Sequence, residues 1–198
     1  MEFKLKFGTS GLRDNDENLT DEQIFIATKA FLNFLISTNQ ISEKKIALAG
    51  DFRPSTNRIL QAVASTIIYC DFNVDYCGKI PTPTLSLYGF KNNIPSIMVT
   101  ASHNPYGQNG IKFNKPSGEV LKSDEQLILN EIKKLENENI TISQEIKEKA
   151  EQSLKIINKE AENLYMQRYK KMFSNILQDI KIVFYQQTAV GREIIPKI

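Results

Sequence analysis

The chain has 198 residues, of which 41% are hydrophobic and 24% charged, a balance typical of a soluble globular chain that can bury a core. Basic and acidic residues nearly cancel, so the net charge of +2 favours neither a nucleic-acid nor a membrane partner. No apolar run approaches the roughly 18 residues of a membrane span, and the first residues lack the apolar segment of a signal peptide. We therefore expect a cytoplasmic protein.

The first hundred residues alternate between helical and strand periodicity. The earliest helix opens with a capping-box pattern at Thr20 and Gln23, ahead of apolar residues at helical spacing. Repeated alternation of this kind predicts an α/β domain whose helices pack around a mixed, largely parallel sheet. The expected elements are a helix over 19–36, a strand over 45–50, a helix over 55–69, a strand over 72–78, a helix from 81–83 and a strand over 96–100.

The character of the chain changes after Phe113. Residues 143–153 are highly charged, and they are interpreted as a solvated linker or helix face rather than a partner site. The remaining expected elements are a short strand over 119–121, a charged helix over 123–137, a helix over 161–177, a strand over 180–185 and the start of a helix at 190–193.

These elements divide the chain into three parts. Residues 1–145 form the α/β domain, residues 146–160 a charged linker, and residues 161–198 an incomplete second α/β unit. One strand with one and a half helices cannot cover both faces of a sheet, so the sequence is interpreted as a truncated piece of a longer protein. An uncovered apolar face of that kind would favour self-association.

The candidate site follows the strand over 96–100. The carboxyl ends of parallel strands are where α/β sheets place their ligands. There Ser102 offers a nucleophile or phosphate acceptor, while His103 and Lys112 offer proton transfer or positive charge. Taken singly, Ser102 is more often a turn residue, and a lone histidine is more often structural.

Five stretches together resemble the α-D-phosphohexomutases, the family of phosphoglucomutases and phosphomannomutases. Residues 100–105 (TASHNP) and 109–112 (NGIK) are similar to the family's active-site serine loop. Residues 7–13 (FGTSGLR), 50–55 (GDFRPS) and 78–83 (GKIPTP) are similar to its other first-domain signatures, in the family's order. The resemblance covers residues 1–140 well, and residues 185–193 look like the start of the second domain of a phosphomannomutase-like branch.

The resemblance implies a fold like the first domain of phosphoglucomutase and a reaction that moves a phosphate between C1 and C6 of a hexose. Ser102 would be held as a phosphoserine that passes its phosphate through a bisphosphorylated sugar intermediate. Lys112 would stabilise charge or transfer a proton, and His103 would assist catalysis or orient the loop. Arg13 would bridge phosphate oxygens with its planar guanidinium.

Two positions qualify that implication. Asp14 stands where the family usually has glycine, and a carboxylate there would repel phosphate unless it points away or pairs with a base. Arg53 is kept outside the catalytic set, because it could simply pair with Asp51.

The resemblance also implies Mg²⁺ and a hexose 1,6-bisphosphate activator. The family's metal site uses three aspartates of the second domain, a loop that this sequence lacks, so Ser102 would supply one metal ligand only. We therefore expect a phosphohexomutase portion that is inactive alone. The alternative is a non-catalytic module that binds a phosphosugar or regulates a partner. A hexose phosphate is the expected substrate; glucose, mannose and glucosamine phosphates stay open, with phosphomannomutase favoured.

Overall fold

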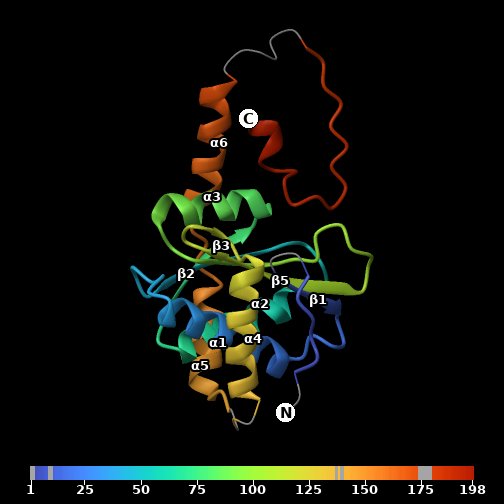
Figure 1. The fold of residues 1–198 in the computed structure, drawn as a ribbon. Coiled ribbons are helices and arrows are strands. Elements are labelled where there is room, and N and C mark those ends of the chain that lie inside the picture. Colours follow the sequence, from blue (N-terminus) through green and yellow to red (C-terminus); the bar gives the residue numbers. More distant parts are fainter. Residues whose placement is uncertain (1–2, 9–10, 137, 139–140, 174–179) are drawn as a thin grey trace.

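The computed structural model describes residues 3–8, 11–136, 138, 141–173 and 180–198. A six-stranded sheet lies between two layers of helices (Figure 1). The strands are β1 (Gly11–Asn15), β2 (Lys45–Gly50), β3 (Asn73–Lys79), β4 (Ser96–Val99), β5 (Gln108–Lys115) and β6 (Gly118–Glu119). The helices are α1 (Asp21–Ser37), α2 (Thr56–Tyr69), α3 (Thr82–Asn92), α4 (Lys122–Leu135), α5 (Gln144–Ser153), α6 (Glu160–Met172) and the short 3₁₀ helix η1 (Ile195–Lys197).

The sheet has the strand order β1-β5-β4-β2-β3, with β6 paired to β5. β2 pairs in parallel with both β3 and β4, whereas β5 is antiparallel to β4, β1 and β6. Five strands therefore share one direction and β5 alone runs against them. This arrangement confirms the mixed, largely parallel sheet expected from the sequence.

Alternating side chains of β2 face the two helical layers. Ile46 and Leu48 point into the larger core, which is covered by α1, α2, α4 and α5. Ala47 and Ala49 point into the smaller core beneath α3 and α6. Figure 1 shows these two layers on opposite sides of the sheet. The sheet is therefore buried on both faces, as expected for strands joined by helical crossovers.

Two strands of this sheet were not predicted. β5 occupies residues expected to continue the serine loop, and β1 lies in a stretch for which no element was expected. Their polar and glycine-containing sequences, GLRDN and QNGIKFNK, have low intrinsic strand preference. Pairing decides their conformation, because β5 lies between β4 and β1 and buries Ile111 and Phe113 in the larger core.

The strand expected over residues 180–185 is wrong for this chain. These residues have no regular secondary structure and pair with no strand of the described ranges, and Val183 is 97% exposed. A strand needs a neighbour to satisfy its backbone groups, and an apolar alternation cannot provide one. The helix expected from residue 190 is likewise replaced by turns that lead into η1.

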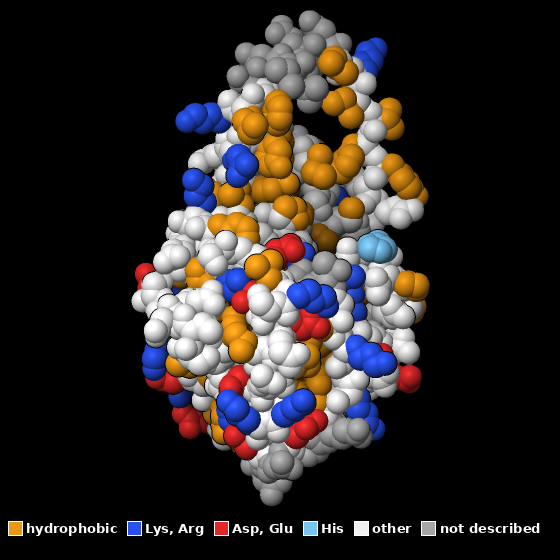
Figure 2. Space-filling view, viewed as in Figure 1, with side chains coloured by type: hydrophobic (Ala, Val, Ile, Leu, Met, Phe, Trp, Pro, Cys, Tyr) orange, Lys and Arg blue, Asp and Glu red, His pale blue; other side chains and the backbone are white. Residues whose placement is uncertain are grey.

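Hydrophobic side chains gather in the upper part of Figure 2, over α6 and the carboxyl-terminal segment. The helix expected over 161–177 forms as α6, while Leu177 lies outside the described residues. No helix within the described ranges has both the length and the apolar character needed to cross a bilayer.

The charged stretch over 143–153 forms a helix, α5, that packs one side on α2. Ala150 is fully buried in the larger core, and Gln61 Nε2 donates a hydrogen bond to the carbonyl oxygen of Lys147 at 2.8 Å. Of the two interpretations, the solvated helix face agrees with this structure. The domain limits at 145 and 160 stay predictions.

Replacing Thr20 by alanine should lower the free energy of unfolding by about 1 kcal/mol. The Thr20 hydroxyl caps α1 by accepting a hydrogen bond from the backbone N–H of Gln23 at 3.3 Å, and alanine leaves that donor without its partner. Urea unfolding followed by circular dichroism measures the loss. Thr20→Ser keeps the hydroxyl and should keep the stability; an equal loss in both variants would contradict the capping role.

Candidate functional site

The candidate site lies where β2 and β4 end side by side. Gly50, the last residue of β2, is in register with Val99, the last residue of β4. The loop over 51–55 and the serine loop, residues 101–107, therefore leave the sheet at the same edge. This is the edge at which parallel α/β sheets place their ligands.

Asp51 is the buried centre of this edge, with 6% of its surface exposed. Its carboxylate accepts hydrogen bonds from Thr56 Oγ1 at 2.7 Å, from the backbone N–H of Arg53 at 3.0 Å and from Thr100 Oγ1 at 2.8 Å. A buried carboxylate needs such donors to offset its desolvation. Asp51 thereby links the first turn of α2 to the residues that precede Ser102.

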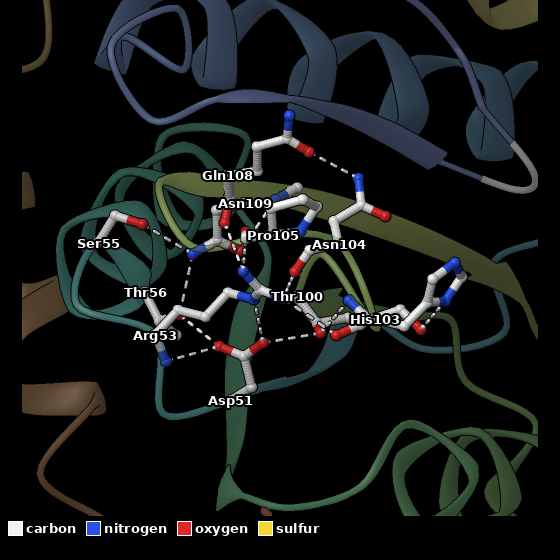
Figure 3. A network of polar contacts seen from close by, with 12 residues as sticks. Asp51, Arg53, Ser55, Thr56, Thr100, His103, Asn104, Pro105, Gln108 and Asn109 are labelled. Carbon is white, nitrogen blue, oxygen red and sulfur yellow. Dashed lines mark hydrogen bonds and ion pairs between the residues drawn. The ribbon is translucent and has the colours of Figure 1, made fainter. Parts of the chain in front are cut away.

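Arg53 connects Asp51 to the serine loop (Figure 3). Its Nε lies 3.4 Å from Asp51 Oδ2, so the pairing that the sequence left open for Arg53 is formed. The guanidinium also donates to four backbone carbonyl oxygens, two from each terminal nitrogen. Nη1 donates to Pro105 O (2.8 Å) and Gln108 O (3.0 Å), and Nη2 to Ser102 O (3.0 Å) and Asn104 O (2.6 Å).

Ser102 is exposed and has a left-handed backbone, with φ of 58°. For a residue with a side chain that conformation costs roughly 1–2 kcal/mol, so neighbouring bonds must hold it. Its backbone N–H donates to Thr100 Oγ1 at 2.9 Å, and the N–H of Asn104 donates to Ala101 O at 3.1 Å. Ser102 Oγ lies 3.4 Å from His103 Nδ1. The structure therefore brings the predicted serine and histidine together on a constrained, accessible turn.

Asn109 fixes the other end of the serine loop. It is fully buried, and its amide nitrogen donates to Ser55 Oγ at 2.9 Å and to Thr56 Oγ1 at 3.0 Å. The next residue, Gly110, must be glycine, because a Cβ there would lie 2.3 Å from the carbonyl oxygen of Leu12. The polar and glycine residues after Ser102 thus make possible the close approach of β5 to α2 and β1.

Arg13 and Lys112 lie on adjacent strands near this edge. Arg13 is in register with Gly110, and Gly11 with Lys112, so both basic residues belong to the same face of the sheet. Lys112 Nζ lies 2.7 Å from Glu119 Oε1. Among the described residues, neither Arg13 nor Lys112 has a recorded contact with Ser102. Thr9 and Ser10, in the amino-terminal signature, lie outside the described residues.

The carboxylate of Asp14, in β1, is bonded to residues close to it in the sequence. Its Oδ1 accepts hydrogen bonds from the backbone N–H of Asn15 at 2.7 Å and from Asn18 Nδ2 at 2.8 Å. The carboxylate that replaces the family's usual glycine is therefore engaged locally.

A cavity of about 750 Å³ adjoins the serine loop. Arg53, Ser102 and Asn104 lie on one side, and the carboxyl-terminal segment over 185–190 on the other. Just after this segment, the Cζ of Arg192 lies 4.7 Å from the ring centre of Phe52. The volume lies within the range of small-ligand sites in proteins, roughly 300–1,000 Å³.

The residues present do not by themselves suit a divalent cation. The described ranges hold no group of three or more His, Cys, Asp or Glu side chains placed to share a metal. The Asp51 carboxylate already has three donors and an ion pair. Ser102 thus stays a single candidate ligand.

Lys79 adds an unusual charge to the same edge. It is the last residue of β3 and is in register with Gly50. Partial burial lowers the pKa of its ammonium group to about 8, and the nearby Asp51 carboxylate opposes that shift. Protonation of Lys79 therefore costs more free energy in the folded protein than in water, and this residue lies beside the site.

Lys79→Met should stabilise the protein below about pH 8, and the gain should shrink as the pH rises towards about 10.5. Below the pKa of Lys79 in the folded protein, the native state carries the whole free-energy cost of burying the ammonium charge. Between the folded and unfolded pKa values the unfolded chain binds more protons, so wild-type stability rises with pH. Urea unfolding at about pH 7 and about pH 9.5 measures the difference. The exposed Lys133→Met serves as control, and a pH-independent gain at Lys79 would contradict the expectation.

Comparison with known proteins gives the same assignment over most of the chain. Residues 4–139 match the family "Phosphoglucomutase/phosphomannomutase, alpha/beta/alpha domain I". A phosphomannomutase of Sinorhizobium fredii is 34% identical over 195 residues, which cover 98% of this chain and 40% of that protein. A phosphomannomutase of Salmonella muenchen is 32% identical over 191 residues, covering 96% of this chain and 37% of the relative.

Solved structures agree on the fold. A putative phosphomannomutase of Thermus thermophilus aligns with a TM-score of 0.58 at 23% identity, over 65% of this chain and 30% of that one. The Paramecium phosphoglucomutase parafusin, in its open form, aligns with a TM-score of 0.56 at 26% identity, over 64% of this chain and 25% of that one. The chain spans about two fifths of the length of the two curated relatives. It belongs to the phosphoglucomutase/phosphomannomutase family, whose α/β/α domain I it contains.

Proposed function

We propose that this chain carries the phosphoserine of a phosphohexomutase, with Ser102 as the group that receives and donates phosphate. One observation supports this most: Ser102 projects from a turn held at two ends, beside a cavity and at the ligand-bearing edge of the sheet. Phosphoryl transfer is catalysed mainly by positioning and electrostatics, which a fixed turn supplies.

In the first step the Ser102 Oγ–P bond breaks and a P–O bond forms to a hydroxyl oxygen of a hexose monophosphate. The sugar hydroxyl loses its proton to a base, and the departing Ser102 Oγ gains one. The bisphosphorylated sugar then reorients and returns its other phosphate to Ser102 by the reverse exchange. The net result is a phosphate moved between C1 and C6, with no net consumption of protons.

His103 is proposed as the proton carrier beside the serine, because its Nδ1 is already 3.4 Å from Ser102 Oγ. Lys112 and Arg13 are proposed to neutralise phosphate charge from the neighbouring strands. For Lys112 that role requires its ammonium group to turn from Glu119, its partner at 2.7 Å in this structure.

The two phosphomannomutases named above, and the phosphoglucomutase/phosphomannomutase family that the chain matches, support a mannose or glucose phosphate as the substrate. The activator that we propose is a hexose 1,6-bisphosphate, which would supply the phosphate on Ser102. When bound, Mg²⁺ would offset the charge of the phosphoserine, with a Ser102 oxygen as one ligand. Because the described residues offer no further shared set of ligands, we infer that this chain alone does not turn over.

The test is incubation of the chain, joined to the parts found in its longer relatives, with glucose 1,6-bisphosphate and Mg²⁺, followed by mass spectrometry of the peptide that contains Ser102. We expect one phosphoryl group on Ser102 of this completed protein, and no conversion of mannose 1-phosphate or glucose 1-phosphate by the chain alone. Absence of phosphate on Ser102, in a completed protein that binds the sugar in a calorimetric titration, would instead favour the non-catalytic phosphosugar-binding module.

A further inference from the structure

We propose that Arg53 is a positioning residue that holds the serine loop in the conformation that presents Ser102 Oγ. It is not expected to bind phosphate itself. The structural part of this inference stands on the contacts of Arg53 alone. Its catalytic consequence rests on the proposed function of Ser102.

The first argument is the number and spread of the bonds. The four carbonyl oxygens that accept from Arg53 come from residues 102–108, so one side chain joins the beginning of the serine loop to its end. No regular secondary structure constrains residues 101–107. Without the guanidinium, these carbonyls would lose a shared charged donor, a kind of hydrogen bond stronger than a neutral one.

The second argument is the direction of the carbonyl dipoles. A carbonyl oxygen that accepts from Arg53 points towards the guanidinium. The negative ends of the Ser102 and Asn104 carbonyl dipoles are therefore directed to a cation and not left to face a phosphate on Ser102. Arg53 thus favours an anion on Ser102 without contacting it.

The third argument is that the site needs arginine in particular. All of the N–H groups of the guanidinium are used: two at Nη1, two at Nη2 and one at Nε facing Asp51. A lysine has three donors on a single nitrogen and cannot reproduce this planar fork. The ion pair with Asp51 fixes the Nε side of the guanidinium, while the carbonyl oxygens fix Nη1 and Nη2.

The structural test is hydrogen exchange of the loop amides in Arg53→Lys, read by mass spectrometry. The backbone N–H groups of Ser102 and Asn104, which are bonded inside the loop, should exchange about tenfold faster or more than in the wild type. Arg58→Lys is the matched control: Arg58 also donates to a carboxylate, Asp21, and to a carbonyl, Leu19 O, but does not touch the serine loop. Arg53→Gln, which keeps part of the side chain, serves if Arg53→Lys does not fold. Wild-type exchange in the folded variant would overturn the proposal.

The functional test is the rate of phosphate transfer from glucose 1,6-bisphosphate to Ser102 in the protein completed by the parts found in its longer relatives. Arg53→Lys should slow labelling at least about tenfold although it keeps the positive charge, and millimolar guanidinium should partly restore labelling in Arg53→Ala. Labelling of Arg53→Lys at the wild-type rate would show that charge alone matters and would overturn the catalytic part. Failure to label the wild type would overturn the function of Ser102, and the exchange result would still decide whether Arg53 positions the loop.

Discussion

Substitution of Ser102 by alanine, in a protein completed by the parts found in its longer relatives, should abolish incorporation of phosphate from glucose 1,6-bisphosphate. It should also lower mutase activity by several orders of magnitude. The reason is chemical, because alanine offers no oxygen to carry the phosphoryl group, and neither His103 nor Lys112 replaces an ester-forming hydroxyl. Intact mass and a coupled mutase assay measure the two effects.

The control for this experiment is Ser123→Ala, which removes an exposed hydroxyl at the start of α4. It should incorporate phosphate as the wild type does. Thermal unfolding of Ser102→Ala should match the wild type, because the hydroxyl is exposed and its one described contact is with exposed His103. Phosphate on another residue of Ser102→Ala, with activity retained, would show that the acceptor has been misassigned.

The sequence predicted the position of the serine loop because the signal there is local. A short apolar strand ends at Val99, and a turn rich in Gly and Asn follows it, so strand order and turn chemistry point to the same place. The capped helix α1 was equally readable, since Thr20 and the apolar spacing after it lie within one turn of each other. These two features were therefore predicted correctly.

The contacts of Arg53 with the serine loop could not be predicted in this way. Its pairing with Asp51, two residues away, was foreseen, whereas its bonds to carbonyls of the serine loop span about fifty positions of sequence. Those bonds exist only because β2 and β4 are neighbours in the sheet. The available clue was indirect: both loops follow strands that a parallel sheet would place side by side.

The prediction of a strand at residues 180–185 is wrong because strand formation, too, depends on residues distant in the sequence. Ile180, Ile182 and Phe184 alternate as convincingly as the residues of β2, so the local pattern was sound. Whether such a pattern becomes a strand depends on a neighbouring strand, and β2 has two while residues 180–185 have none in the described ranges. β5 shows the converse: its sequence has a low intrinsic strand preference, but it forms a strand because it pairs with β1 and β4.

Replacing Asp51 by alanine should lower the free energy of unfolding by about 3–5 kcal/mol, the range for loss of one member of a buried ion pair. Thr56 and Thr100 would lose their common acceptor, and the guanidinium of Arg53 its counter-ion. Urea unfolding measures the loss, which is a large share of the stability of an ordinary domain, about 5–15 kcal/mol.

Asp51→Asn removes the negative charge of the side chain and keeps its shape. The amide oxygen of asparagine can still accept from one hydroxyl, whereas its NH₂ group would face the donors that the second carboxylate oxygen binds in the wild type. We therefore expect a smaller loss in the free energy of unfolding, about 1–3 kcal/mol. Because Thr100 Oγ1 donates to Asp51 and also accepts from the Ser102 N–H, the damage should reach the serine loop as faster amide exchange there. Thr100→Ser, which keeps the hydroxyl, should leave that exchange unchanged. A loss below about 1 kcal/mol in Asp51→Ala would mean that Arg53, through its carbonyl bonds, supports the edge of the sheet without its carboxylate partner.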